Sequence, residues 1–148
     1  MAGGHLLVGR EVEKARLLDL LETAGKEKPG LVLVAGEAGI GKSALVEEVL
    51  AGIDRPILRG ASTPGATSPY GPLVQILRAY ARDHRDALLR LQLADHLSLL
   101  LPELGLGEVD TDPATLHAAV CDAAALAGDA GSIWVLEDLH WGDQGTLD

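Results

Sequence analysis

The chain has 148 residues, enough for one domain with a hydrophobic core and too few for two ordinary domains. Its formal net charge of −10 argues against a surface that wraps nucleic acid, because phosphate contacts need clustered Lys and Arg. No apolar run approaches the roughly 18 residues of a membrane span, and the start lacks the pattern of a signal peptide. We therefore expect a cytoplasmic chain that does not contact a membrane.

The first third of the chain alternates helical and strand patterns. Residues 11–24 have the spacing of a helix with one buried side. The short apolar run LVLVA at 31–35 is typical of a strand that is covered on both faces, and helical spacing returns at 42–51. The apolar positions of the first helix are Val12, Ala15, Leu18 and Leu21.

The remainder of the chain continues this alternation. Residues 60–72, GASTPGATSPYGP, have the composition of a loop. Asp112 followed by Pro113 is a good helix entrance, because Asp supplies an N-cap acceptor and Pro needs no hydrogen bond from its nitrogen there. The only cysteine, Cys121, is expected to be a buried helix residue. We expect strands at 56–59 and 133–136, helices at 73–81 and 113–127, and a Leu-rich segment at 85–101 that stops at Pro102. This order predicts an α/β fold with a parallel sheet flanked by helices.

The segment GEAGIGKS at 36–43 satisfies the phosphate-binding pattern G-x-x-x-x-G-K-[ST] and follows an expected strand. Its glycines can adopt backbone angles that turn N–H groups toward phosphate oxygens, and the helix that begins near Lys42 adds the positive end of its dipole. We expect Lys42 to reach the β- and γ-phosphates and the Ser43 hydroxyl to bind Mg²⁺. The alternative is a glycine-rich turn that only connects two elements. The predicted phosphate-binding residues are Gly36, Glu37, Ala38, Gly39, Ile40, Gly41, Lys42 and Ser43.

Two acids, Glu137 and Asp138, follow the last expected strand, where open α/β sheets place their ligand crevice. Cleavage of a triphosphate needs one acidic group for the magnesium shell and another to orient or deprotonate the attacking water. The residues alone do not decide which acid has which role, and a solvated strand end is the alternative for both. His140 and Trp141 lack metal-ligand spacing, so we interpret them as structural, with water positioning by His140 as an alternative.

Four blocks of the sequence resemble, in the right order, the AAA-type ATPase module of large bacterial LuxR-type (MalT-like) transcriptional regulators. These regulators belong to the signal-transduction ATPases with numerous domains, known as STAND. The opening VGRE and the later LEDLHW are more specific than the P-loop, which very many NTPases share. The blocks are LLVGREVEKARLLDLL, GLVLVAGEAGIGKSALVEEV, SPYGPLVQIL and IWVLEDLHWGDQGTLD.

The resemblance implies a P-loop NTPase fold, three-layer α/β/α with a parallel AAA-like sheet, of which 1–148 is the N-terminal part and which is incomplete at its C-terminus. It implies ATP and Mg²⁺ as cofactors. Many relatives have Asp-Asp where this chain has Glu-Asp, which weakens the division of roles between the two acids. For Arg10, a solvated charge at a helix start is the alternative. The implied site residues are Val8, Gly9 and Arg10 for adenine, 36–43 for the phosphates, Lys42 and Asp138 for catalysis, and Ser43 and Glu137 for the metal.

In such regulators the strand after the Walker B acids inserts between the P-loop strand and the Walker B strand. A helical lid, sensory repeats and a DNA-reading helix-turn-helix follow. We therefore expect 1–148 to be part of a longer protein that self-associates and contacts DNA only through a domain outside this chain. We also expect little or no ATP hydrolysis by this segment alone.

The function expected from the resemblance is a switch, in which ATP binding stabilises a closed, oligomerising state of a LuxR-type regulator and slow cleavage to ADP resets it. The alternatives are the same ATPase module attached to an enzyme effector, such as a cyclase or phosphotransferase, and an origin-recognition-like DNA ATPase.

Overall fold

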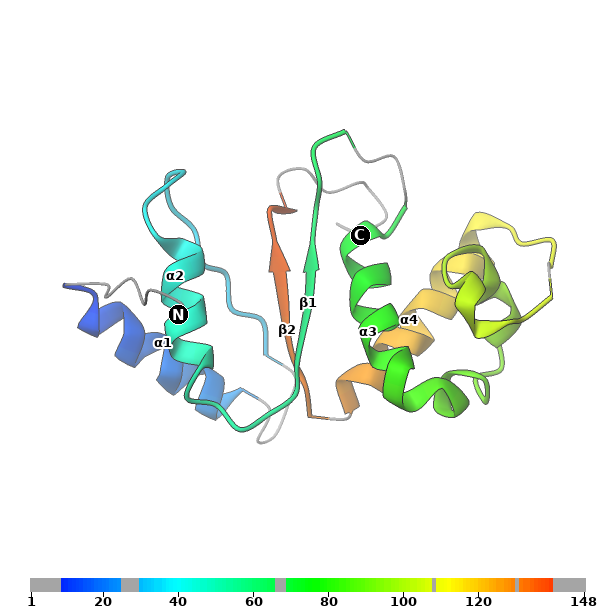
Figure 1. Ribbon diagram of the computed structural model, residues 1–148, viewed down its shortest axis with the longest axis horizontal. Helices are drawn as coiled ribbons and strands as arrows, with labels where there is room; N and C mark the ends of the chain where they lie inside the picture. Colours follow the sequence, from blue (N-terminus) through cyan, green and yellow to red (C-terminus); the bar gives the residue numbers. More distant parts are fainter. Residues whose placement is uncertain (1–8, 25–29, 66–68, 108, 130, 140–148) are drawn as a thin grey trace, which may run out of the picture. The chain divides into compact units, whose positions relative to one another are not determined.

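The computed structural model describes residues 9–24, 30–65, 69–107, 109–129 and 131–139 (Figure 1). The chain divides into two compact units, Met1–Asp54 and Arg55–Asp148. The predicted mixed α/β class with a parallel sheet is confirmed. The elements in chain order are α1 (Glu11–Thr23), α2 (Lys42–Leu50), β1 (Ile57–Ala61), α3 (Gly71–Leu88), the 3-10 helices η1 (Ala94–Leu99) and η2 (Pro102–Leu104), α4 (Pro113–Asp129) and β2 (Ile133–Glu137).

The first unit is built on the packing of α1 against α2. Both helices lie within a residue of their predicted ends, and the predicted buried side of α1 is confirmed only in part, because Leu18 and Leu21 pack on the core but Val12 does not. Val12 is 79% exposed, and Leu17 is the buried residue of the helix. Among the described residues of this unit, α2 is the one helix that α1 contacts, so only a narrow face of α1 is buried. An ion pair between Lys14 and Glu48 joins the two helices. The small core consists of Leu17, Leu45 and Val49 with Leu18, Leu21, Val32, Val46 and Ile53 packed around them.

The expected strand at 31–35 is not formed, and 31–37 has no regular secondary structure. The side chains still alternate, because Val32 packs on the core of the first unit while Leu31 and Leu33 are 94% and 78% exposed. The expectation that this run is covered on both faces is therefore wrong for the described residues. A strand needs a neighbouring strand to satisfy its backbone groups, and this segment has none among the described residues of its own unit.

The second unit contains the parallel pair β1 and β2, in register from Ile57 opposite Ile133 to Ala61 opposite Glu137. Figure 1 shows α3 running beside β1 and α4 lying beyond α3. β1 extends two residues past its expected end into the predicted loop, and α3 runs to Leu88, past the expected end at 81. The sequence prediction thus locates these elements correctly and misplaces their ends. The largest fully buried side chains of this unit include Ile76, Leu77, Leu88, Leu97, Leu101 and Leu104.

The Leu-rich segment after α3 folds as short helical turns that cover α3 and α4. η1 ends at Leu99, before Pro102, as the predicted stop requires, and Pro102 begins the further turn η2, which the sequence did not predict. Cys121 is exposed, and the prediction that it is buried is also wrong. Helical geometry explains this result, since the buried face of α4 passes through Val120 and Ala123 while Cys121 lies beside His117, one turn away on another face.

The predicted start of α4 at Asp112 and Pro113 is confirmed. Asp112 Oδ1 accepts hydrogen bonds from the backbone N–H groups of Ala114 at 2.9 Å and Thr115 at 3.1 Å. Asp112 thus satisfies two amides that have no partner within the helix. The hydrogen bond from the Thr115 hydroxyl is the main reason that the pKa of Asp112 lies below its usual value, and the backbone bonds add to this effect.

This capping predicts a pH-dependent stability. A carboxyl group whose pKa is lowered on folding stabilises the fold above its unfolded pKa, and this contribution disappears as the pH falls through the folded pKa. We expect wild-type protein to be more stable than Asp112→Asn at pH 7, and the difference to shrink below about pH 4. Urea unfolding at a series of pH values measures the difference. If the difference in stability between wild type and Asp112→Asn stays constant down to about pH 2, the charge of Asp112 does not contribute to stability.

Candidate nucleotide-binding site

The loop between the exposed 31–35 segment and α2 has the glycine conformations that its pattern predicts. Gly39 and Gly41 have φ angles of +75° and +92°, which residues with a Cβ rarely adopt. A weak backbone hydrogen bond of 3.4 Å from Ile40 N–H to the Glu37 carbonyl holds the turn. A Cβ on Gly36 would lie 3.2 Å from Cγ2 of Ile40, so the loop is tightest at its first glycine. The loop is exposed from Gly36 to Ile40.

Lys42 lies across this loop. Its Nζ donates hydrogen bonds to the carbonyls of Gly36 at 3.0 Å and Glu37 at 2.9 Å. An ammonium group has three hydrogen atoms to donate, so these two bonds leave one donor for another acceptor. The side chain is half-buried, and its charge is held on the loop rather than projected into solvent.

The N-terminus of α2 supplies further donors. Gly41 is its N-cap residue, and no side chain caps the helix. The first hydrogen bond of the helix runs from Leu45 N–H to the Gly41 carbonyl at 3.0 Å, so the amides of Lys42, Ser43 and Ala44 precede it. Such amides, at the positive end of the helix dipole, favour an anion. Ser43 is exposed in the first turn of α2, in reach of the same region.

The structure also brings Arg10 to the loop. Arg10 precedes α1, and its Nη2 donates a hydrogen bond of 2.6 Å to the carbonyl of Ile40. Arg10 is therefore more than a solvated charge at a helix start. Gly9, the residue before Arg10, has a φ of +88° and forms a turn. Val8 lies outside the described residues. The contact of this segment with the adenine stays a prediction.

The two acids are at the carboxyl end of β2, as predicted. Glu137 is the last residue of the strand and is half-buried, while Asp138 is exposed. Asp138 has a φ of +54°, an uncommon left-handed conformation for a residue with a Cβ, although Asp adopts it more readily than most. Outliers of this kind cluster at functional sites, which supports a functional role for Asp138. His140 and Trp141 lie outside the described residues.

Ser62, which follows β1 next to these acids, is a residue that the sequence pattern did not single out. Its backbone N–H donates a hydrogen bond of 3.0 Å to the carbonyl of Glu137, and its side chain is only 7% exposed. The Ser62 hydroxyl has no hydrogen-bond partner among the described residues. Ser and Thr are ordinary in a loop of this composition, so the sequence offers no signal that separates Ser62 from its neighbours.

The structure thus assembles one half of the predicted site in each unit. Gly36 to Ser43 and Arg10 lie together in the first unit, and Glu137 and Asp138 lie together in the second. A glycine loop with a lysine folded over it at a helix N-terminus, and acids ending a parallel strand, define the P-loop NTPase class of protein.

A family model described as the AAA ATPase domain matches residues 6–148, and the chain belongs to this family. Membership implies a nucleotide-binding ATPase module. Comparisons with curated proteins and with solved structures gave no match. Among the residues that the structure describes, no helix has the length and apolarity needed to cross a membrane.

Proposed function

We propose that this chain is the ATP-binding part of a nucleotide-controlled switch in a LuxR-type, STAND-class transcriptional regulator. The observation that carries the proposal is the hydrogen bonding of Lys42 Nζ to the carbonyls of Gly36 and Glu37. It places an ammonium group on a loop whose glycines already have the required angles, so binding of a triphosphate needs little rearrangement of the backbone.

In this proposal the loop amides and Lys42 bind the phosphates, and Val8, Gly9 and Arg10 lie beside the adenine. The Ser43 hydroxyl and the Glu137 carboxylate would hold Mg²⁺. When bound, Mg²⁺ would neutralise negative charge on the β- and γ-phosphate oxygens. Hard oxygen ligands such as a hydroxyl and a carboxylate suit this ion.

Asp138 orients the attacking water and accepts its proton. Its exposed carboxylate, on a residue with a left-handed backbone conformation, fits this role better than that of Glu137, which is half-buried in the strand. Slow cleavage then returns the switch to the ADP state, and the ATP state favours self-association. DNA contact belongs to another domain of the complete protein.

The proposal also explains why the apolar segment 31–35 is exposed. Leu31 and Leu33 are exposed on either side of Val32, which packs on the core of its unit. In the complete protein we expect a strand from further along the chain to pair with this segment and cover the two leucines. An unpaired apolar run of this kind otherwise promotes aggregation.

We expect Asp138→Ala in the complete protein to retain ATP binding and to lower the rate of phosphate release by about 100-fold or more. Nucleotide affinity is measured by calorimetry and turnover by phosphate release. Asp122→Ala is the matched control, because it removes an exposed carboxylate from α4 of the same unit. Unchanged turnover would remove Asp138 from catalysis. Loss of Mg²⁺-dependent binding would instead assign the metal to Asp138.

A further inference from the structure

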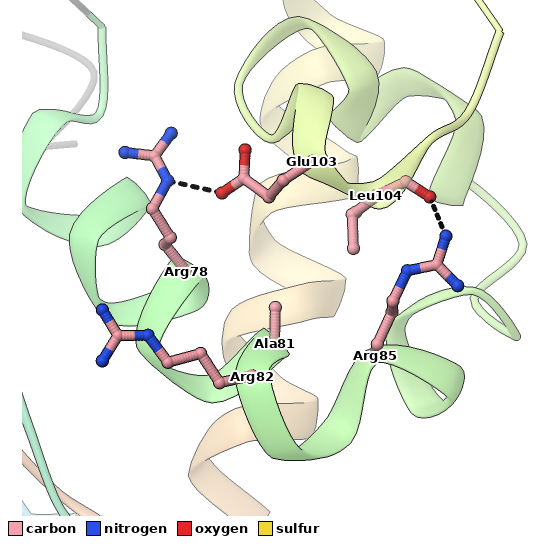
Figure 2. A pocket seen from close by; sticks show the side chains of 6 residues that line it. All are labelled: Arg78, Ala81, Arg82, Arg85, Glu103 and Leu104. Carbon is pink, nitrogen blue, oxygen red and sulfur yellow. Dashed lines mark hydrogen bonds and ion pairs between the residues drawn. The ribbon is translucent and has the colours of Figure 1, made fainter.

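A hollow between α3 and η2 carries an unusual concentration of positive charge. Its cavity volume is about 310 Å³, near the lower limit for small-ligand sites. Figure 2 shows Arg78 and Arg85 reaching toward η2 on either side of Ala81, whereas the head group of Arg82 points away from η2. Arg85 follows the kink of α3 at His84. The lining residues are Arg78, Ala81, Arg82, Arg85, Glu103 and Leu104.

Two of the three arginines are already anchored. Arg78 Nε pairs with Glu103, and its Nη2 donates a hydrogen bond of 3.3 Å to the Leu100 carbonyl. Arg85 Nη2 donates to the Leu104 carbonyl. These bonds fix two guanidinium groups before any ligand arrives and leave several of their N–H donors free.

Arg82 differs from its neighbours. It is exposed and has no hydrogen bond or ion pair with any other residue that the structure describes. In Figure 2 its head group lies on the same side of α3 as that of Arg78. Two guanidinium groups on one side repel each other unless an anion lies between them. Among the lining residues, Glu103 is the one carboxylate beside three arginines, and Asp83 and Asp86 of the same helix are not among them.

The remaining lining is apolar and tightly packed. Ala81 is 8% exposed and Leu104 is 1% exposed, so a ligand would meet hydrocarbon beneath the charged rim. An extended polyanion is disfavoured because the rest of the chain is acidic, whereas a small dianion matches the excess of arginines over carboxylates among the lining residues. Guanidinium groups bind phosphate oxygens through paired, charge-assisted hydrogen bonds.

We propose that the hollow lined by Arg78, Arg82 and Arg85 binds a small phosphate monoester with a compact apolar body. The site lies within the second unit and uses none of the residues assigned to ATP. Its occupancy is therefore separable from the proposed nucleotide switch.

Phenyl phosphate is a suitable probe, followed through the Nε–Hε resonances of the arginines. We expect saturable shifts at Arg78 and Arg82, with inorganic phosphate and benzoate each binding at least about fivefold more weakly, because one lacks the apolar body and the other the second charge. The absence of saturable shifts would overturn the proposal. So would equal binding of benzoate, or shifts confined to the amides of Gly39 to Ser43.

Two variants of this site should change the affinity for phenyl phosphate in opposite directions. We expect Arg82→Gln to weaken phenyl phosphate binding by about tenfold or more, because it removes a charged donor. We expect Glu103→Gln to strengthen binding severalfold, since it removes the carboxylate that competes for Arg78. If the Arg78–Glu103 ion pair had only a structural role, Glu103→Gln would not increase the affinity for phenyl phosphate.

Arg90→Gln is the matched control, because Arg90 is an exposed arginine of the same unit that does not line the hollow. It should leave binding unchanged. Arg82 has no partner to lose in the described structure, so its variant should keep the wild-type melting temperature. Unaltered binding in Arg82→Gln, or an equal loss in Arg90→Gln, would refute the site.

Discussion

Replacing Lys42 with alanine should lower the affinity for ATP by about 100-fold or more. The structure fixes the ammonium group directly on the glycine loop through the Gly36 and Glu37 carbonyls, beside Arg10, which is bound at the Ile40 carbonyl. A charge-assisted hydrogen bond contributes about 1.5–3 kcal/mol, and we expect this group to contact both the β- and γ-phosphates. The two carbonyls that lose their donor belong to exposed residues, so water can replace it and the fold should tolerate the change.

Calorimetric titration with ATP and Mg²⁺ measures this loss. Lys14→Ala serves as the control, because it removes the same charge from the same unit at an ion pair with Glu48, away from the loop. It should leave the affinity for ATP within a few fold of wild type. Lys42→Ala protein that still binds ATP tightly would contradict the assignment of the P-loop.

The second large effect concerns stability. Gly60→Ala should destabilise the protein by about 3 kcal/mol, at the upper end of overpacking costs. A Cβ at this position of β1 would lie 2.1 Å from the Pro72 carbonyl oxygen and 2.9 Å from its Cα. These atoms belong to the backbone of the first turn of α3, so relief requires the helix to move away from the sheet.

Urea unfolding measures the change, and Gly128→Ala is its matched control. Gly128 lies in α4, where an added Cβ would meet no atom from another part of the described structure within 4 Å, and alanine is the better helix former. The free energy of unfolding of Gly128→Ala should therefore equal that of wild type or be slightly higher. If Gly60→Ala unfolds at the wild-type urea concentration, α3 does not pack on β1 as described.

The parts of the fold that the sequence predicts are those governed by local chemistry. The cap at Asp112 depends on residues within three positions, and the loop at 36–43 depends on glycines whose φ angles no other residue adopts as easily. Register between β1 and β2 could not be predicted, because it depends on pairing between segments that lie far apart in the chain.

The errors have a common cause in tertiary packing. The 31–35 run has strand composition, but composition cannot supply the neighbouring strand that its backbone needs. The buried face of α1 is decided by where α2 lies, so Leu17 rather than Val12 enters the core. The arginines at 78, 82 and 85 have helical spacing in the sequence, yet nothing there shows that Glu103 and Leu104 lie opposite them.

The central claim is that the backbone of 36–43 binds the phosphates of a nucleotide. The most direct test is a titration of the protein with a nonhydrolysable ATP analogue and Mg²⁺, followed through the backbone amide resonances. We predict saturable shifts that are largest from Gly39 to Ala44, where the loop glycines and the uncapped first turn of α2 place their N–H groups. Shifts that are absent there, or that are confined to other parts of the chain, would contradict it.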